Sequence, residues 1–439
     1  MQLPISQNII RKVVDDLKIK DFSRATIREV VAIAGKIEQE TGLEFIHMEM
    51  GVPGLPPAAV GVEAEIAALK EGVASIYPII DGLPKLKQEA SRFIKAFVDL
   101  DILPEGCVPV VGSMQGTFAS FLIAGQCDAQ RDTILFIDPG FPVQKQQAVV
   151  LGYKHESFDV YDFRGVQLKE KLESYLAKGN IACIIYSNPN NPAWFCLNEQ
   201  ELRVIGELAT RYDTIVLEDL AYFAMDFRKD LGTPFQPPYQ ASVGKYTDNY
   251  LLLISGSKAF SYAGQRIGIV AMSDTLYRRS YPGLTERYGG GTFGSVFIHR
   301  ALYAISSGTS HSAQYALAAM LKAASDGDFH FLDEVKEYGR RAKRLKAIFL
   351  KHGFEIVYDR DLDEAIADGF YFTIRYPGLS GGELMAALIP FGISAISLST
   401  TGSNQEGLRA CTSFIKEHQY DLLDRRLTAF INSQSALSR

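Results

Sequence analysis

The 439-residue sequence has few cysteines, few histidines and a single tryptophan. Its five cysteines form no CxxC pair, so we expect free thiols, a reducing compartment and, by default, the cytoplasm. Its seven histidines show no HxH or HExxH spacing, so we expect no metal site. The sequence also lacks a signal-like start and any apolar run long enough to span a bilayer, and we therefore expect no membrane partner.

An excess of positive charge is absent as well. The formal net charge is -6 at pH 7, whereas nucleic acids and anionic membranes bind basic surfaces, so neither is expected as a main partner. What is present is the composition of a globular protein, with 47% hydrophobic and 22% charged residues. The length predicts two domains.

Between about residues 108 and 272, short apolar runs alternate with helical stretches. This rhythm predicts an α/β fold, with a mostly parallel sheet that carries helices on both faces. Each run is followed by a loop rich in glycine, proline or polar residues: 108–111 by 112–116, 133–137 by 138–142, 181–186 by 187–192, 214–217 by 218–222, and 251–254 by 255–268. Because ligands bind at the carboxyl ends of such strands, the five loops are expected to share one crevice.

The remainder of the chain follows a different pattern. Residues 1–50 show helical spacing and form an N-terminal segment expected to join a smaller domain. After about residue 300, helices are followed by three short apolar runs typical of strands. We therefore predict a large domain over 51–300 and a smaller α+β domain over 301–439.

The loop 255–268 carries the most reactive side chain of the five. Lys258 stands where a strand ends, and a lysine at such a dry end lowers its pKa easily, so that a neutral amine can attack a carbonyl. Arg266 has a planar fork suited to phosphate. Gly112, Ser113 and Met114 open a helix after a strand, which makes a second anion-binding position.

The other loops hold side chains with two interpretations each. Phe141 can stack on a flat ring or fill the core. Asp219 can bond a protonated ring nitrogen or cap a helix. Asn191 and Tyr222 can donate to a ring oxygen, or form a turn and pack. Taken together, they describe the binding site of a flat, phosphorylated heterocycle that bears an aldehyde, which is pyridoxal 5'-phosphate.

These residues occur in recognisable motifs. The motifs are S-x-S-K with an arginine eight residues later and then x-Gly (Ser255, Ser257, Lys258, Arg266, Gly268), D-x-x-Y (Asp219, Tyr222), N-P-x-N-P (188–192), P-G-F (139–141), Y-x-x-x-x-G (Tyr77, Gly82) and a late arginine, Arg409. In order and spacing the chain resembles the class I/II aminotransferases, the fold-type-I pyridoxal-phosphate enzymes, from about Gly51 to Arg409.

The resemblance implies a role for each cofactor-binding residue. Lys258 would form a Schiff base and move the substrate Cα proton, and Asp219 would keep the pyridine nitrogen protonated. The ring would be contacted by Tyr222, Asn191 and Phe141, and the phosphate by Ser113, the Met114 amide, Ser255 and Arg266. Tyr77 would reach the phosphate of a neighbouring subunit, which implies a homodimer with composite sites.

The resemblance also implies how substrate is bound. Arg409 would bind the α-carboxylate, with Gly51 and Asn191 nearby. The chain departs from the family where Ala193-Trp194-Phe195 replaces the usual Thr-Gly, which is either a tolerated loop variant or an apolar substrate wall with Phe22 and Tyr262 as neighbours. Arg287 and Arg300 lie where dicarboxylate-specific relatives keep a clamp, but neither sits in a recognisable motif. The sequence therefore favours large apolar amino donors over aspartate.

The favoured function is an aminotransferase that acts on an α-amino acid and a 2-oxo acid. The alternative on the same scaffold is a β-eliminating lyase or a decarboxylase, which the cofactor residues do not separate from it. A third hypothesis is the cofactor-binding half of a transcription regulator. It is disfavoured because only about 50 residues precede Gly51, too few for a DNA-binding domain and a linker.

Overall fold

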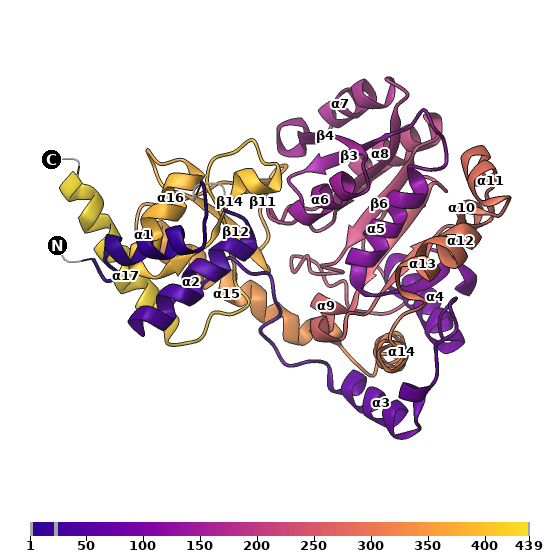
Figure 1. Cartoon of the computed structure of the whole chain (residues 1–439), viewed down its shortest axis with the longest axis horizontal. Helices are drawn as coiled ribbons and strands as arrows, with labels where there is room; N and C mark the ends of the chain where they lie inside the picture. Colours follow the sequence, from indigo (N-terminus) through magenta and orange to yellow (C-terminus); the bar gives the residue numbers. More distant parts are fainter. Residues whose placement is uncertain (1–2, 22–24, 438–439) are drawn as a thin grey trace. The chain divides into compact units, whose positions relative to one another are not determined.

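The computed structural model describes residues 3–21 and 25–437 (Figure 1). The chain forms two compact units, each held by its own internal contacts. Unit 1 comprises Met1–Gly54, Asn191–Phe195 and Lys336–Arg439, and unit 2 comprises Leu55–Asn190 and Cys196–Val335. Phe22, named above beside Trp194, lies outside the described residues.

Unit 2 is built on a seven-stranded sheet in the order β2-β8-β7-β6-β5-β3-β4. The strands are β2 (Cys107–Val110), β3 (Thr133–Asp138), β4 (Lys154–Asp159), β5 (Ile181–Ser187), β6 (Ile215–Leu220), β7 (Tyr250–Ser255) and β8 (Gly268–Met272). Only β8 runs against its neighbours, because its pairings with β2 and β7 are antiparallel and the other pairings of this sheet are parallel. The carboxyl ends of the other six strands therefore lie at one edge.

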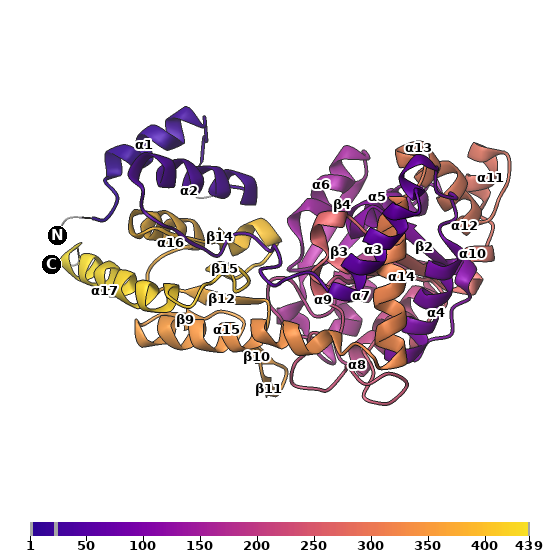
Figure 2. The same ribbon diagram turned by 90° about the horizontal axis from the view of Figure 1, so that it is seen from below.

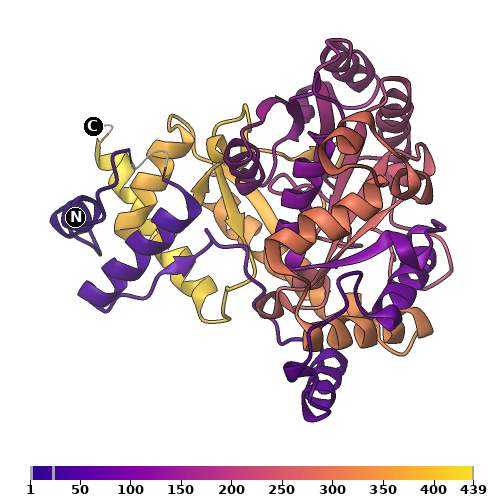
Figure 3. The same ribbon diagram turned by 45° about the vertical axis from the view of Figure 1, so that its right-hand side comes forward.

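Burial on both faces explains the composition of the central strands. Every residue of β3, β6 and β7 is buried, as expected for near-continuous apolar runs in a covered parallel sheet. Helix α5 (Gly112–Ala124) packs on β6, β7 and β8, and α8 (Glu199–Arg211) packs on β6. Figure 3 shows helices packed around the sheet of unit 2. The predicted α/β class is confirmed.

The strand β4 has no counterpart among the runs identified from sequence. Its residues read Lys-His-Glu-Ser-Phe-Asp, and only the last two are buried. Because β4 pairs with β3 alone, it is an edge strand, and an edge strand needs few apolar residues. Polar edge strands of this kind escape a search for apolar runs.

Three helices of unit 2 pack as a group beside the sheet. Helix α14 (His311–Asp326) packs on α3 (Ala59–Lys70) and α4 (Pro84–Val98), and α4 also contacts β2. The remaining helices of unit 2 are α6 (Pro142–Val150), α7 (Gln167–Leu176), α9 (Gly256–Ala259), α10 (Asp274–Arg278), α11 (Pro282–Tyr288), α12 (Phe293–Val296) and α13 (Tyr303–Ser306). Because of its packing, α14 belongs to unit 2, whereas the sequence-based boundary near residue 300 would assign it to the smaller domain.

Unit 1 has its own sheet and core. The sheet is antiparallel in the order β14-β15-β12-β9, from Ile396–Ser397, Leu408–Cys411, Tyr371–Arg375 and Glu355–Ile356. A second, parallel pair joins β1 (Ile46–His47) to β13 (Ile393–Ser394), and β10 (Arg360–Asp361) pairs with β11 (Glu364–Ala365). The α-helices are α1 (Gln7–Asp16), α2 (Ile27–Thr41), α15 (Phe331–Lys351, which belongs to this unit from Lys336 onward), α16 (Gly381–Leu388) and α17 (Gln419–Leu437). Figure 2 shows α15, α16 and α17 around the antiparallel sheet. Side chains of all three helices, among them Phe349, Leu384 and Leu427, join one hydrophobic core with Phe372 of β12.

No helix in the described part of the chain is long and apolar enough to cross a membrane. Within residues 3–21 and 25–437, no three His, Cys, Asp or Glu side chains gather as metal ligands would.

Candidate active site

Lys258 and Tyr222 come together at the carboxyl edge of the unit 2 sheet. Lys258 lies in the short helix α9, directly after β7, and Ser255 caps this helix by accepting a hydrogen bond from the Ser257 N–H (3.1 Å). Tyr222 follows β6, the neighbouring strand, and its ring centroid lies 5.9 Å from Lys258 Nζ. The predicted nucleophile thus faces an aromatic ring at the sheet edge expected to bind ligand.

Asp219 is a buried carboxylate on the adjacent strand β6. It is 6% exposed and accepts hydrogen bonds from Gln144 Nε2 (2.8 Å) and from the Ala221 N–H (3.1 Å). Burial raises the pKa of Asp219 to about 6, and the two hydrogen bonds only partly oppose this shift. Asp219 forms no ion pair with the described residues. A buried carboxylate of this kind fits a cationic ligand atom such as a protonated ring nitrogen.

An anion-binding cradle forms where α5 begins. Gly112 has φ +67°, and a Cβ added to it would lie 2.6 Å from Arg266 Nη2. A Cβ on Gly268 would lie 3.4 Å from the Ser113 N–H nitrogen, and Gly268 pairs with Ser255 across β7 and β8. The first turn of α5 therefore opens beside Arg266, with Ser255 next to it. Free N–H groups at a helix start, together with a guanidinium, suit a phosphate.

The loop after β3 reaches the same part of unit 2. Phe141 is half-buried and precedes α6, whose Gln144 side chain bonds Asp219. Asn190 Nδ2 donates to the carbonyl of Pro139 (2.9 Å), which ties the loop after β5 to the loop after β3. Gln144 was missed by sequence reasoning, because a glutamine on a helix has no spacing that marks it as a partner of a distant carboxylate.

In unit 1, Arg409 is a buried guanidinium on β15. It is 1% exposed, its Nη2 donates to the Glu49 carbonyl (2.5 Å), and its Nη1 donates to Asn191 Oδ1 (3.5 Å). Its Nε has no hydrogen-bond partner among the described residues, and none of their carboxylates pairs with it. The guanidinium lies 4.6 Å from the centre of the Tyr371 ring, a cation–π contact. An uncompensated buried cation is the property expected of a carboxylate-binding site.

Gly51 and Trp194 both pack around Tyr371. A Cβ on Gly51 would lie 1.8 Å from Tyr371 Oη, so no other residue fits there without displacing the ring. The fully buried Trp194 meets the Tyr371 ring edge-on at 6.2 Å, and a Cβ on Gly369 would lie 2.0 Å from its indole. Its φ of +67° is unusual for a bulky residue. Sequence reasoning missed Tyr371, whose motif Phe-Tyr-Phe looks like an ordinary core strand.

Two further residues named from sequence lie on the surface of unit 2. Tyr77 is 90% exposed and lines a pocket of about 590 Å³ with residues 306–312. Arg287 is exposed on α11. Neither makes a contact in the single chain that tests its predicted role, so both assignments stay predictions.

Fold and site together define a class: an α/β protein whose sheet edge presents a lysine, a buried carboxylate and a phosphate cradle. The family follows from the sequence comparison, which matches the family described as aminotransferase class I and II over residues 45–420. The chain belongs to this family, whose members depend on pyridoxal phosphate. The isolated Asp219 carboxylate and the Gly112–Arg266 cradle fit that cofactor.

Individual relatives are distant. A probable aspartate aminotransferase of Methanocaldococcus jannaschii is 24% identical over 259 residues, which cover 59% of this chain and 63% of that protein. A glutamate–pyruvate aminotransferase of Escherichia coli is 27% identical over 239 residues, 54% of this chain and 55% of its own. The matched region thus spans less than two thirds of either relative. A double mutant of Thermus thermophilus aspartate aminotransferase superposes with a TM-score of 0.74 at 16% identity, covering 95% of this chain and 98% of that one, which supports the fold.

Proposed function

We propose that the protein is a pyridoxal-phosphate-dependent aminotransferase that moves an amino group from an α-amino acid to a 2-oxo acid. The observation that carries the proposal is Asp219, a buried carboxylate that forms no ion pair with the described residues and stands one strand away from Lys258. Membership of the aminotransferase class I and II family supports it. The names of the relatives are consistent with it but describe those proteins.

In this proposal the unit 2 residues bind the cofactor and move protons. The cofactor, when bound, supplies an aldehyde and an electron-withdrawing ring. Asp219 holds the proton on the ring nitrogen, and the amine of Lys258 takes and returns the proton of the substrate Cα. Tyr222 donates to the ring oxygen, and Phe141 packs on the ring. The phosphate is bound by Arg266, Ser113, Ser255 and the Met114 amide.

Arg409 is proposed to bind the α-carboxylate of the substrate. Support comes from unit 1 alone: the guanidinium is buried, stacked against Tyr371, and lacks an acidic partner in the described part of the chain. Two parallel N–H···O bonds to a carboxylate would satisfy it. Asn191 and the Glu49 carbonyl fix the fork, and Gly51 leaves room for Tyr371.

The proposed preference is for donors with large apolar side chains over aspartate. Arg287 and Arg300, the two candidates for a second carboxylate clamp, are both exposed. Trp194 packs against Tyr371 and Gly369, and its effect on substrate is proposed to pass through Tyr371. Burying a large apolar side chain is worth about 1.5 to 3 kcal/mol, enough for roughly tenfold to hundredfold preference over alanine.

One experiment tests both the reaction and the preference. Turnover of leucine, methionine, phenylalanine, tyrosine and aspartate is measured with and without 2-oxoglutarate, and glutamate is assayed with pyruvate, because its exchange with 2-oxoglutarate gives no net product. Ammonia release is measured in parallel, and serine is included in that measurement. An aminotransferase turns over continuously only with the acceptor. Ammonia and 2-oxo acid formed without an acceptor, from a donor with a β leaving group such as serine, would instead establish the lyase alternative. Higher kcat/KM for aspartate than for leucine would refute the apolar preference.

We also propose a homodimer in which Tyr77 contacts the cofactor phosphate bound by the neighbouring subunit. Support comes from a set of exposed apolar side chains on and after α3, unusual for a monomer surface. They are Ile66 (47% exposed), Leu69 (47%), Ile76 (60%), Tyr77 (90%) and Ile79 (62%).

A cytoplasmic location is proposed from the five free cysteines, four of which are buried, and cell fractionation would test it.

A further inference from the structure

We propose that Glu65 is a positioning residue that holds the loop carrying Lys258 and Arg266 in its binding conformation. The inference rests on the proposed function only in assigning cofactor roles to those two residues. The restraint itself is a property of unit 2 in the absence of any ligand. It involves three side chains, Glu65, Tyr262 and Ser312, which we call the Glu65 junction.

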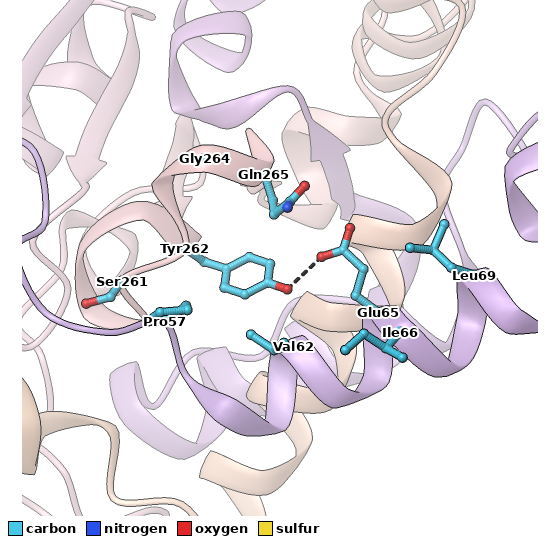
Figure 4. A pocket seen from close by; sticks show the side chains of 9 residues that line it. All are labelled: Pro57, Val62, Glu65, Ile66, Leu69, Ser261, Tyr262, Gly264 and Gln265. Atoms are coloured by element: carbon cyan, nitrogen blue, oxygen red, sulfur yellow. Dashed lines mark hydrogen bonds between the residues drawn. The ribbon is translucent and has the colours of Figure 1, made fainter.

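The Glu65 junction joins three segments at one buried carboxylate. Glu65 lies on α3 and is 8% exposed. One of its oxygens accepts a hydrogen bond from Tyr262 Oη (2.6 Å), and Tyr262 belongs to the loop 255–268, called here the lysine loop. The other oxygen accepts a hydrogen bond from Ser312 Oγ (2.9 Å), and Ser312 belongs to α14. Figure 4 shows the Tyr262 ring extended across the space between the loop and α3 toward the Glu65 carboxylate.

The lysine loop needs such a restraint because its backbone is strained at two positions. Ser261 has φ +50° and Arg266 has φ +51°, a left-handed conformation that residues other than glycine rarely adopt. Conformations of this kind persist only where the surrounding structure enforces them. Arg266 is the proposed phosphate ligand, so relaxation of its backbone would move the guanidinium away from the Gly112 cradle.

Tyr262 is the buried anchor between these two strained residues. It is 4% exposed, whereas Gly264, Gln265 and Arg266 are exposed. On the outer side of the loop, Ser261, Gly264 and Gln265 border a pocket of about 380 Å³ opposite α3 (Figure 4). Packing is therefore thin on this side, and the restraint depends on hydrogen bonds.

Two hydrogen bonds tie the loop to α3. The Ala58 N–H donates to the Phe260 carbonyl (3.2 Å) at the start of the helix, and Tyr262 donates to Glu65 two turns later. Burial and the Glu65 carboxylate both raise the pKa of Tyr262, so the phenol keeps its proton and remains a donor across the working pH range. Removing the acceptor would leave a buried hydroxyl without a partner, which favours opening of the loop.

The test measures loop opening directly, by hydrogen–deuterium exchange of peptides covering 256–266 in cofactor-free protein. Tyr262→Phe removes only the hydroxyl. Glu65→Ala removes the acceptor of its hydrogen bond, whereas Glu65→Gln keeps an oxygen that can accept it. Glu63→Ala is the matched control, because Glu63 is exposed on the same helix. We expect exchange about tenfold faster in Tyr262→Phe and Glu65→Ala, a smaller change in Glu65→Gln and none in Glu63→Ala. The dissociation constant for pyridoxal phosphate should rise about tenfold in the same two variants.

Ser312→Ala separates positioning from simple helix packing, because it breaks only the hydrogen bond from α14. If Tyr262→Phe and Glu65→Gln both fold and leave exchange of the loop unchanged, the proposal is overturned, even if both lower the melting temperature as Ser312→Ala does. Should the protein bind no pyridoxal phosphate while loop exchange still responds to Tyr262→Phe, the positioning role stands and the proposed function fails. The two failures are therefore distinguishable.

Discussion

Replacing Asp219 with asparagine should stabilise the cofactor-free protein at neutral pH. The Asp219 carboxylate is 6% exposed and, in the described part of the chain, has two neutral hydrogen-bond donors and no cation. At neutral pH the folded protein must bury this negative charge, whereas the unfolded chain exposes it to water. Asparagine has nearly the same shape and no charge. It can keep the bond from the Ala221 N–H, and the Gln144 amide can turn to accept from its Nδ2.

The magnitude follows from the shift of the pKa. Burial moves the pKa of Asp219 from 3.8 to about 6, so in that interval the folded state binds more protons than the unfolded state. Stability therefore falls as the pH rises from 3.8 to 6 and stays low above it. Two pKa units correspond to about 3 kcal/mol, and we expect Asp219→Asn to recover about 2 to 3 kcal/mol at pH 8 and roughly half of that at pH 5.

Urea unfolding of cofactor-free protein at pH 8 and pH 5 provides the measurement. Asp248→Asn is the control, because Asp248 is an exposed carboxylate in the same unit. In the presence of pyridoxal phosphate the order should reverse, since the wild-type carboxylate then has a cationic partner and asparagine does not. A variant that is no more stable than wild type at pH 8, or a gain that is equal at both pH values, would refute the assignment of Asp219 as an uncompensated buried charge.

Two further predictions concern substrate and assembly. Arg409→Lys should lower kcat/KM for amino acids about tenfold to a thousandfold, because lysine lacks the bidentate fork. The control is Arg426→Lys, which should leave kcat/KM unchanged, since Arg426 is also buried and donates to backbone carbonyls. An equal loss of kcat/KM in both variants would mean that impaired folding is responsible. Mixed dimers of Tyr77→Phe and Lys258→Ala should recover part of the activity, because one of their sites regains both residues; exchanged but inactive hybrids would exclude a cross-subunit role for Tyr77.

The placement of several candidate cofactor residues at one edge of the sheet could be predicted from the sequence, for a physical reason. Reactive residues follow buried strands, and the carboxyl ends of parallel strands lie at one edge whatever their order in the sheet. Lys258, Asp219 and Tyr222 could therefore be assigned to one edge without knowing that β8 is antiparallel or that β4 exists. The first turn of α5 was assigned in the same way, from a strand followed by glycine and serine.

Contacts between segments distant in sequence could not be predicted. Gln144 bonds Asp219 across 75 residues, Glu65 bonds Tyr262 across 197, and the Glu49 carbonyl accepts from Arg409 across 360. Nothing in the local pattern of a helix or strand indicates which remote side chain it meets. The same holds for Trp194, whose neighbours Tyr371 and Gly369 appear only once the strand β12 is in place.

The two units share one energetic feature, each considered by itself. Unit 2 buries a carboxylate, Asp219, and unit 1 buries a guanidinium, Arg409, and neither forms an ion pair with the described residues. An isolated buried charge costs several kcal/mol, a large part of the total stability of a domain. If folding were the only requirement, asparagine in place of Asp219 and an apolar residue in place of Arg409 would give a more stable protein. In the proposed function a bound molecule neutralises each charge: a protonated ring nitrogen would pair with Asp219, and a substrate carboxylate would pair with Arg409. In that case part of the binding free energy of each ligand comes from removing the cost of an unpaired buried charge, a cost that lowers the stability of the unliganded protein.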